Sequence, residues 1–333
     1  MHESVINAWF GDGGWTRSLM PLSLVFNRIA HKRKAKYLSK KRWIPPVPVM
    51  VVGNITVGGT GKTPLVASLV KGLQQRGYSP GVVSRGFGAN TDAYPVAVTS
   101  DSDPRQVGDE PVMLAHQLQV PVVVDPDRVS AAQFLCEQYA CDLIIADDGL
   151  QHYNLRRHLE LLVLDGRRML GNGYCLPAGP LREPPERLNT VDMVFSNGQP
   201  GTDPGVPYTC FNLVPQSLRP VSQGVEASAD ELPKACRVHG VAGIGNPGRF
   251  FTTLADQGFD VIPHAFPDHY QFTGADIAFG DGLPVIMTAK DAVKCRLFAQ
   301  SQHWYLPVAT DLPDSVLDTI ANLIEESVRI QHG

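Results

Sequence analysis

Residues 51–63 read Val-Val-Gly-Asn-Ile-Thr-Val-Gly-Gly-Thr-Gly-Lys-Thr, and this stretch decides the fold. An apolar run over 47–52 predicts a strand, and a glycine-rich loop over 56–61 follows it before Lys62 and Thr63 open a helix. Glycines let backbone N–H groups turn toward phosphate oxygens, and a helix N-terminus adds partial positive charge. We expect a nucleotide triphosphate here, with Lys62 on the β/γ-phosphates and the Thr63 hydroxyl on Mg2+. The loop residues expected around the phosphates are Thr56, Val57, Gly58, Gly59, Thr60 and Gly61.

One position departs from the usual GxxxxGK[ST] pattern, because Thr56 stands where the first glycine is expected. An ordinary glycine turn before a helix is the alternative interpretation. The strand, the glycines and the Gly-Lys-Thr triplet together favour phosphate binding over that alternative.

A second strand predicts a metal site. Leu143-Ile-Ile-Ala146 is a buried apolar run that ends in Asp147 and Asp148, which is the form of a Walker B strand. A carboxylate at the end of such a strand holds Mg2+ directly or through water, although turn-forming aspartates also cap strands. Which aspartate ligates directly stays open. Gln151 and His152 follow closely and are candidates for contacts with the nucleotide or the metal's waters.

Strand-like and helix-like segments alternate from residue 80 to residue 165, and again after residue 236. This order predicts an α/β protein with a P-loop NTPase-like parallel sheet, helices on both faces, a smaller C-terminal α/β domain and an N-terminal amphipathic helix. The expected divisions are an interface segment over 1–44, a kinase-like domain over 45–205, a β-ribbon linker over 206–234 and a closing domain over 235–333.

The N-terminal segment carries an apolar stripe. Its members, spaced by three or four residues, are Trp15, Leu19, Leu22, Phe26 and Ile29. Residues 28–42 add eight cations and no acid, which leaves the rest of the chain strongly acidic. The apolar run is too short to span a bilayer. The stripe either docks on the protein's own core or lies in a membrane interface, with the basic run over anionic headgroups.

Further polar residues are candidates for catalysis. Asp109 stands at a predicted helix start, where it serves either as a cap or as the general base that phosphoryl transfer to an alcohol needs. Four arginines are candidates for contacting anions, namely Arg85, Arg128, Arg182 and Arg187. Arg182 is the most suggestive, because prolines bound its loop.

The C-terminal half contains two motifs that resemble nucleotide-binding motifs but that we expect not to form such sites. Residues 243–248 fit GxGxxG, but the next strand lacks the acid that a dinucleotide site requires. Thr288-Ala289-Lys290 echoes a guanine-contact loop, yet no Asn-Lys-x-Asp occurs in the chain. His269 lies in a polar turn and would reach a cleft only if the two domains close on each other.

Several of these segments together resemble one family. They are Val-Gly-Asn-Ile-Thr-Val-Gly-Gly-Thr-Gly-Lys-Thr-Pro (52–64), Ser-Arg-Gly-Phe-Gly (84–88), Gly-Asp-Glu-Pro (108–111), Asp-Pro-Asp-Arg (125–128), Asp-Asp-Gly-Leu-Gln-His (147–152), Pro-Ala-Gly-Pro-Leu-Arg-Glu-Pro (177–184), Gly-Ile-Gly-Asn-Pro-Gly-Arg-Phe (243–250) and Phe-Pro-Asp-His-Tyr (266–270). The chain resembles the tetraacyldisaccharide 4′-kinases, the lipid A kinases of Gram-negative bacteria, nearly end to end. That family shares the non-glycine at Thr56, and usually has Glu where Ala289 stands.

The resemblance implies ATP- and Mg2+-dependent phosphorylation of the 4′-hydroxyl of an acylated glucosamine disaccharide 1-phosphate. It implies a peripheral or monotopic protein at the cytoplasmic face of the inner membrane, on an anionic surface and without nucleic acid, and it favours the interface for the N-terminal stripe. Asp109 becomes the base with His269 as partner, and Arg182 and Glu183 lie beside the phosphates. Lys62, Thr63, Asp147, Asp148, Gln151 and His152 surround the nucleotide and metal.

Two other functions remain as alternatives. A P-loop ATPase that switches or delivers a cargo would need no acceptor, but its usual Cys/His metal cluster has no counterpart in the spacing of the six cysteines. A nicotinamide enzyme would use the glycines of 243–248, and NADH titration would detect it.

Overall fold

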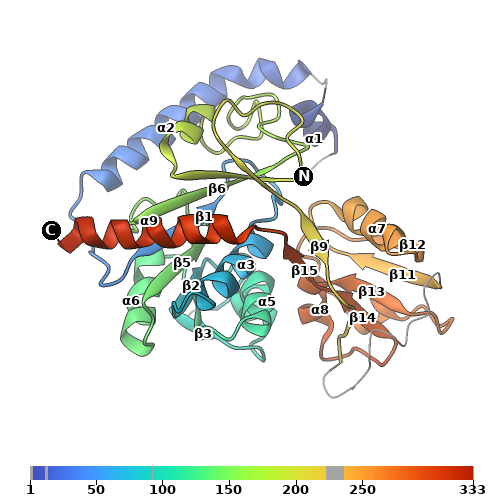
Figure 1. The fold of residues 1–333 in the computed structure, drawn as a ribbon. Coiled ribbons are helices and arrows are strands. Elements are labelled where there is room, and N and C mark those ends of the chain that lie inside the picture. The colour runs from blue at the N-terminus through green and yellow to red at the C-terminus, as the bar shows by residue number, and fades with distance from the viewer. Residues whose placement is uncertain (1–2, 12–13, 92, 223–235, 333) are drawn as a thin grey trace.

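The computed structural model describes residues 3–11, 14–91, 93–222 and 236–332. These residues form a large lobe and a small lobe, each built around its own sheet (Figure 1). The larger sheet has eight strands in the order β3-β4-β2-β5-β1-β6-β7-β8, and the smaller has five in the order β10-β14-β13-β11-β12. The α/β architecture expected from the sequence is confirmed.

The strands of the large sheet are parallel except for β3, which pairs antiparallel with β4. Their bounds are β1 Val49–Gly53, β2 Pro80–Ser84, β3 Val96–Val98, β4 Val122–Val124, β5 Leu143–Asp147, β6 Leu159–Asp165, β7 Met193–Asn197 and β8 Thr209–Phe211. Strand β1 lies between β5 and β6, and Val52 pairs with Asp147. The loops after β1, β5, β6 and β7 therefore meet at one edge of the sheet.

Helices cover both faces of this sheet because its central strands are apolar on both sides. Along β1, Met50 and Val52 belong to one core cluster, whereas Val49 and Val51 belong to the other. The first cluster includes residues of α3 (Lys62–Gln74), α5 (Asp109–Gln117) and α9 (Asp314–His332), and the second includes residues of α6 (Arg128–Gln138). A short helix, α4 (Pro104–Val107), precedes α5.

The small lobe is a second α/β unit. Its elements are β10 Arg219–Pro220, β11 Arg237–Ala242, α7 Pro247–Asp256, β12 Asp260–Ala265, the 3-10 helix η4 Gly274–Ile277, β13 Val285–Thr288, α8 Ala289–Cys295 and β14 His303–Leu306. Two antiparallel strands, β9 (Leu213–Pro215) and β15 (Val308–Thr310), form the ribbon that joins the lobes (Figure 1).

The chain then returns to the large lobe, which differs from the expected closing domain over 235–333. Helix α9 contacts α3 and β6, and Arg76 of the large lobe pairs with Asp314 and Asp318. The apolar face of α9 is buried by the large sheet, so the small lobe ends near residue 310. The linker expected over 206–234 also contributes β8 to the large sheet, and its residues 223–234 lie outside the described residues.

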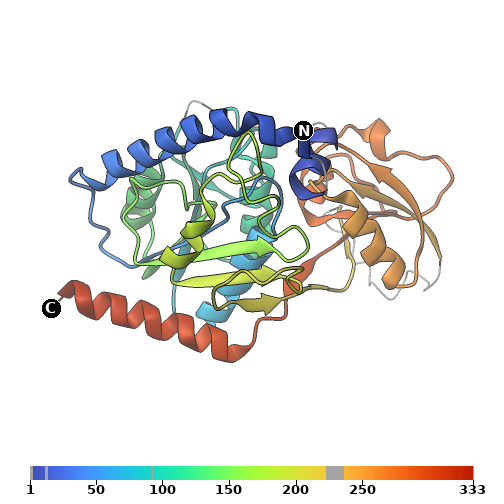
Figure 2. The ribbon, with the colours of Figure 1, turned by 90° about the horizontal axis from the view of Figure 1, so that it is seen from above.

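The N-terminal elements lie along the large lobe (Figure 2). They are α1 (Glu3–Phe10), the 3-10 helix η1 (Gly14–Leu19) and α2 (Met20–Leu38). The Ser23 hydroxyl anchors α2, since it donates to the Cys175 carbonyl (2.8 Å) and accepts from the Ala178 N–H (3.0 Å). These partners belong to the long segment between β6 and β7, which contains one 3-10 helix, η2 (Pro185–Thr190).

The predicted apolar stripe splits between two environments. Phe26 packs against the core, and Leu19 is half-buried. In contrast Leu22, Val25 and Ile29 are 57%, 56% and 62% exposed. Ser23 and Phe26, not the whole stripe, therefore set which side of α2 faces the protein. Within the described ranges, no helix combines the length and the apolar character needed to cross a membrane.

Candidate active site

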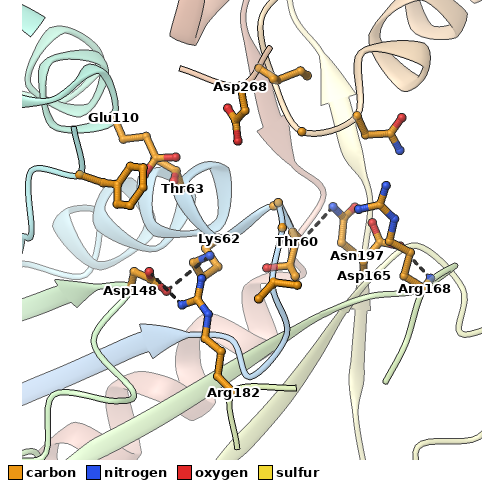
Figure 3. A pocket seen from close by; sticks show the side chains of 18 of the residues that line it. Thr60, Lys62, Thr63, Glu110, Asp148, Asp165, Arg168, Arg182, Asn197 and Asp268 are labelled. Carbon is orange, nitrogen blue, oxygen red and sulfur yellow. Dashed lines mark hydrogen bonds and ion pairs between the residues drawn. The ribbon is translucent and has the colours of Figure 1, made fainter. Parts of the chain in front are cut away.

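The glycine-rich loop after β1 is shaped by the end of β7. Gly61 has φ 87°, and a Cβ there would lie 2.4 Å from Nδ2 of Asn197. The same Nδ2 donates to the Thr60 carbonyl (3.1 Å; Figure 3). Only glycine combines this backbone conformation with so close an approach. Asn197 was not predicted as a site residue, because strand β7 was not expected.

The first half of the loop pairs with residues 180–182. Thr56 forms an antiparallel bridge with Leu181, and the Val57 N–H donates to the Pro180 carbonyl (2.9 Å). The Arg182 N–H donates to the Ile55 carbonyl (2.6 Å). Thr56 therefore occupies an extended, buried position that does not require glycine, and this pairing carries Arg182 to the phosphate loop.

Lys62 and Arg182 converge on Asp148 (Figure 3). Lys62 Nζ lies 3.5 Å from Asp148 Oδ1, and Arg182 Nη1 lies 3.4 Å from Oδ2. Burial alone would raise the pKa of Asp148, but the charges of Lys62 and then Arg182 outweigh it and hold that pKa below its usual range. Asp148 is thus a carboxylate at neutral pH, between two cations that also line the cleft.

Asp147 occupies a different environment at the end of β5. Its side chain is 1% exposed, and Oδ1 has no hydrogen-bond partner within the described part of the chain. Burial, followed by the charge of Glu110, raises the pKa of Asp147 to about 7. Thr63, the second residue of α3, is also buried. A cation placed between these groups would satisfy the orphaned oxygen.

Two of the four candidate arginines are structural. Arg128 is 1% exposed and donates to the carbonyls of Asp125 (2.8 Å) and Asp147 (3.3 Å), so it braces the Walker B strand. Burial lowers the pKa of Arg128 to about 10. Arg187 is buried against Glu160 (2.5 Å) and Glu183 (3.3 Å). Neither of these guanidinium groups is free for phosphate.

Glu183 is bound by protein donors. Gln151 Nε2 donates to Glu183 Oε1 (2.7 Å) and to the Asn54 carbonyl (3.1 Å), and the Tyr153 hydroxyl donates to Glu183 Oε2. Glu183 therefore fixes Gln151 against the phosphate loop. His152 lines the same cleft, and burial followed by the charge of Arg128 lowers its pKa to about 3, so the ring is neutral at pH 7.

Asp109 and His269, which are 160 residues apart in sequence, meet between the lobes. His269 Nδ1 lies 3.0 Å from Asp109 Oδ2 and 3.2 Å from Oδ1. Burial favours a high pKa for Asp109, but the hydrogen bond from His269 and the charges of Lys290 and Lys294 lower it below its usual range. The same bond to Asp109 raises the pKa of His269 against the effect of burial.

Two lysines of α8, Lys290 and Lys294, lie beside this pair, although Lys290 belongs to a motif that was expected not to form a nucleotide-binding site and Lys294 was not a candidate. Lys290 Nζ lies 3.0 Å from Asp268 Oδ1 and 3.3 Å from Glu110 Oε1. Lys294 is 2% exposed and lies 2.7 Å from Asp291 and 3.9 Å from Asp109. Their spacing of four residues places both on one side of a helix, but only the tertiary fold shows which acids they meet.

The GxGxxG segment belongs to this cleft as well. A Cβ at Gly245 would lie 3.7 Å from the Gly59 nitrogen, and Arg249 of α7 donates to Asn197 Oδ1 (2.9 Å). The tight turn before α7 therefore lies against the phosphate loop.

A cleft of about 1510 Å3 connects these groups. Its lining includes Lys62, Asp148 and His269 at the phosphate loop, and Phe26 and Ile29 at α2. The volume exceeds the upper range of typical small-ligand sites, about 1,000 Å3. One continuous space thus runs from a phosphate-binding loop to an apolar N-terminal helix.

Comparison with known proteins identifies the kind of site. Residues 15–325 match the family described as tetraacyldisaccharide-1-P 4′-kinase. The chain belongs to this family. Among the family's curated members, one from Alcanivorax borkumensis is 49% identical over 96% of both chains, and one from Alkalilimnicola ehrlichii is 52% identical over 87% of both. Both are named tetraacyldisaccharide 4′-kinase.

A solved structure of a family member extends the likeness to three dimensions. The crystal structure titled "apo" form LpxK from Aquifex aeolicus in complex with ATP has a TM-score of 0.76 and 27% identity. The match covers 93% of this chain and 99% of that one. The match therefore spans both lobes, whose residues together line the cleft of this chain.

Proposed function

We propose that this chain transfers the γ-phosphoryl group of ATP to the 4′-hydroxyl of a tetraacyldisaccharide 1-phosphate. The observation that carries the proposal is one cleft lined by both the phosphate loop and His269, whose ring contacts the buried carboxylate of Asp109. Nucleotide hydrolysis alone needs no base for an alcohol, whereas phosphoryl transfer to a hydroxyl gains from one. Family membership supplies the chemical identity of donor and acceptor.

Asp109 is the proposed base. An alcohol is a poor nucleophile at neutral pH, so a group that accepts its proton while the O–P bond forms lowers the barrier. The depressed pKa of Asp109 keeps it ionised, and burial at the start of α5 removes competing water. His269 donates from Nδ1 to this carboxylate and fixes its orientation toward the cleft.

Cations and backbone groups are proposed to stabilise the charge of the transferring group. Lys62 opens α3 beneath the phosphate loop, and Arg182 reaches the same point from the paired segment. Preorganised donors of this kind act most strongly in a site that excludes water. Loop residues 58–61 supply backbone N–H groups, since the Val57 N–H is bonded to the Pro180 carbonyl; Gln151 and His152 lie at the side, and Glu183 acts indirectly by holding Gln151.

The residues beside the loop fit a magnesium ion. Thr63, Asp147 and Asp148 offer one hydroxyl and two carboxylates, and hard oxygen ligands are those that Mg2+ prefers. The orphaned buried Oδ1 of Asp147 supports this assignment, since it gains a partner when a cation is bound. When bound, Mg2+ offsets negative charge on the phosphate oxygens.

We further propose that α2 places the protein at the cytoplasmic face of the inner membrane, as a peripheral or monotopic protein. Leu22, Val25 and Ile29 are exposed at the N-terminal half of α2, and Lys32 and Lys36 are exposed farther along. An apolar patch followed by cations suits an interface with anionic headgroups. An acylated acceptor resides in such an interface, and the cleft opens beside α2.

Vesicle flotation tests the membrane proposal. Replacing Leu22, Val25 and Ile29 with Ser removes apolar burial worth about 1.5–3 kcal/mol per fully inserted side chain, so binding should fall by at least about tenfold. Leu297→Ser is the matched control, because Leu297 is fully exposed on the small lobe. Binding of the triple variant at the wild-type level, or loss of its folded state, would assign this face to something other than the membrane.

Transfer of label tests the main proposal. The protein is incubated with γ-labelled ATP and tetraacyldisaccharide 1-phosphate in mixed micelles, and the product is located by NMR. We expect label on the 4′-oxygen and none on an acceptor that lacks the 4′-hydroxyl. Label at another position, or in the absence of any acceptor hydroxyl, would refute the assignment.

A further inference from the structure

The two ring nitrogens of His269 face chemically opposite neighbours. Nδ1 lies 3.0 and 3.2 Å from the carboxylate oxygens of Asp109, which accept hydrogen bonds. Nε2 lies 3.4 Å from the ammonium nitrogen of Lys290, and an ammonium group only donates. The neutral ring that satisfies both neighbours carries its proton on Nδ1 and a lone pair on Nε2.

Lys290 is itself held in place. Its ammonium group has three hydrogens, and three acceptors surround it: Asp268 Oδ1 at 3.0 Å, Glu110 Oε1 at 3.3 Å and His269 Nε2 at 3.4 Å. The side chain is 13% exposed, so little water competes for these positions. Rotation of the ammonium away from Nε2 would leave one donor without a partner in a buried site.

The charges that face His269 come from three segments. The N-terminal end of α5 supplies Asp109 and Glu110, the loop before η4 supplies Asp268, and α8 supplies Lys290 together with Lys294, whose charge is paired with Asp291. A second proton on His269 would sit on Nε2 and point at the Lys290 ammonium. Lys290 and burial therefore oppose protonation of the ring, whereas Asp109 favours it, as does Asp268, whose Oδ1 lies 3.9 Å from Nε2.

We propose that Lys290 is a positioning residue that holds the neutral form of His269 in the Nδ1–H tautomer, which leaves Asp109 as the proton acceptor of the pair. The inference rests on the proposed function of Asp109. In the reaction, the acceptor O–H bond breaks and its proton binds an Asp109 oxygen, while the O–P bond forms and ADP departs. His269 then orients the carboxylate and does not carry the proton away.

The arrangement also links the base to closure of the lobes. Lys290 and His269 belong to the small lobe, whereas Asp109 and Glu110 belong to the large lobe. Nε2 of His269 meets Lys290 of its own lobe, whereas Nδ1 meets Asp109 of the other lobe. Contact between the lobes therefore supplies the hydrogen bond that orients Asp109.

Nitrogen NMR of the full chain with 15N-labelled histidine tests the tautomer directly, with His269→Gln to assign the signal. We expect Nδ1 protonated and Nε2 unprotonated in the wild type at pH 8, with no acceptor present. The proton on Nε2 would overturn the proposal. Because this measurement needs no activity, a chain with the expected tautomer but no transfer would contradict the proposed function instead.

Variants of Lys290 separate positioning from structural support. With Lys290→Met, the pKa of His269 should rise, and the acidic limb of the kcat/KM profile should shift to higher pH with it. The value of kcat should fall about tenfold. Lys290→Arg should restore most of the rate, and Lys71→Met on the exposed side of α3 is the matched control. An unchanged His269 titration in a folded Lys290→Met protein would overturn the proposal. If that variant unfolds, the wild-type tautomer and Lys290→Arg still decide it.

Discussion

Replacing Asp109 with Asn and His269 with Gln, singly and together, tests whether the two residues act as one catalytic unit. Asp109→Asn keeps the shape of the side chain but removes its basicity, and general bases contribute about 10²–10⁴-fold to a rate. His269→Gln removes a hydrogen bond to a charged group, made at 3.0 Å, which is worth about 1.5–3 kcal/mol. Since each 1.36 kcal/mol is about tenfold, the expected loss is roughly 10- to 150-fold.

The rate of the double variant shows whether His269 acts through Asp109 or independently of it. If His269 acts only by orienting Asp109, it has nothing to orient once the carboxylate is gone. Asp109→Asn/His269→Gln should then be within about threefold of Asp109→Asn alone, although independent residues would multiply their losses.

Single-turnover transfer from labelled ATP to the acylated acceptor measures these rates, and calorimetry measures ATP affinity. Affinity for ATP should change little in the three variants, because neither residue belongs to the phosphate loop or to the cluster of Lys62, Asp148 and Arg182. His116→Gln, on the exposed end of the same helix α5, is the matched control. Losses that multiply, or a His269→Gln protein with the wild-type rate, would refute the reasoning and return Asp109 to the role of a helix cap.

Two further outcomes follow from the same geometry. Lys62→Ala should lower kcat by about 100-fold or more while the melting temperature stays near that of the wild type, because its pairing with the partly exposed Asp148 is a weak contact; near-normal activity would contradict the phosphate-loop assignment. The pKa of His269 is raised above its usual 6.5, so its contribution to stability should be complete below about pH 6.5 and be lost as pH rises through the folded pKa. Denaturation of wild type and His269→Gln across pH 5.5–8.5 measures this difference, and a gap that widens with pH would contradict it.

Strong local patterns made much of the fold predictable. Short stretches of sequence predict the phosphate loop, the Walker B strand and the strand–helix alternation. The positions of glycines, prolines and apolar runs indicate where these elements begin and end. The parallel sheet then brings the ends of β1 and β5 to one edge, which places Lys62 beside Asp148. The placement of Asp109 beside His269 came from family resemblance, because nothing local joins residues 160 positions apart.

The remaining features depend on tertiary structure. Strand β7 is short and follows a turn-rich loop, so no local pattern marks Asn197 as a site residue. The N-terminal stripe has helical spacing throughout, yet Phe26 faces the core and Leu22 faces solvent, because Ser23 fixes the rotation of α2. The role of the Lys290 ammonium group depends on the acids that the fold places around it, Asp268 of its own lobe and Glu110 of the other lobe.

Acceptor-dependent ATP turnover tests the central claim most directly. ADP release is measured with saturating ATP and Mg2+, with and without tetraacyldisaccharide 1-phosphate in mixed micelles. The account predicts that turnover requires the acylated disaccharide and that one ADP forms for each phosphorylated product. Turnover at the same rate without the acceptor would contradict it, and would identify a P-loop ATPase that acts as a switch or delivery factor.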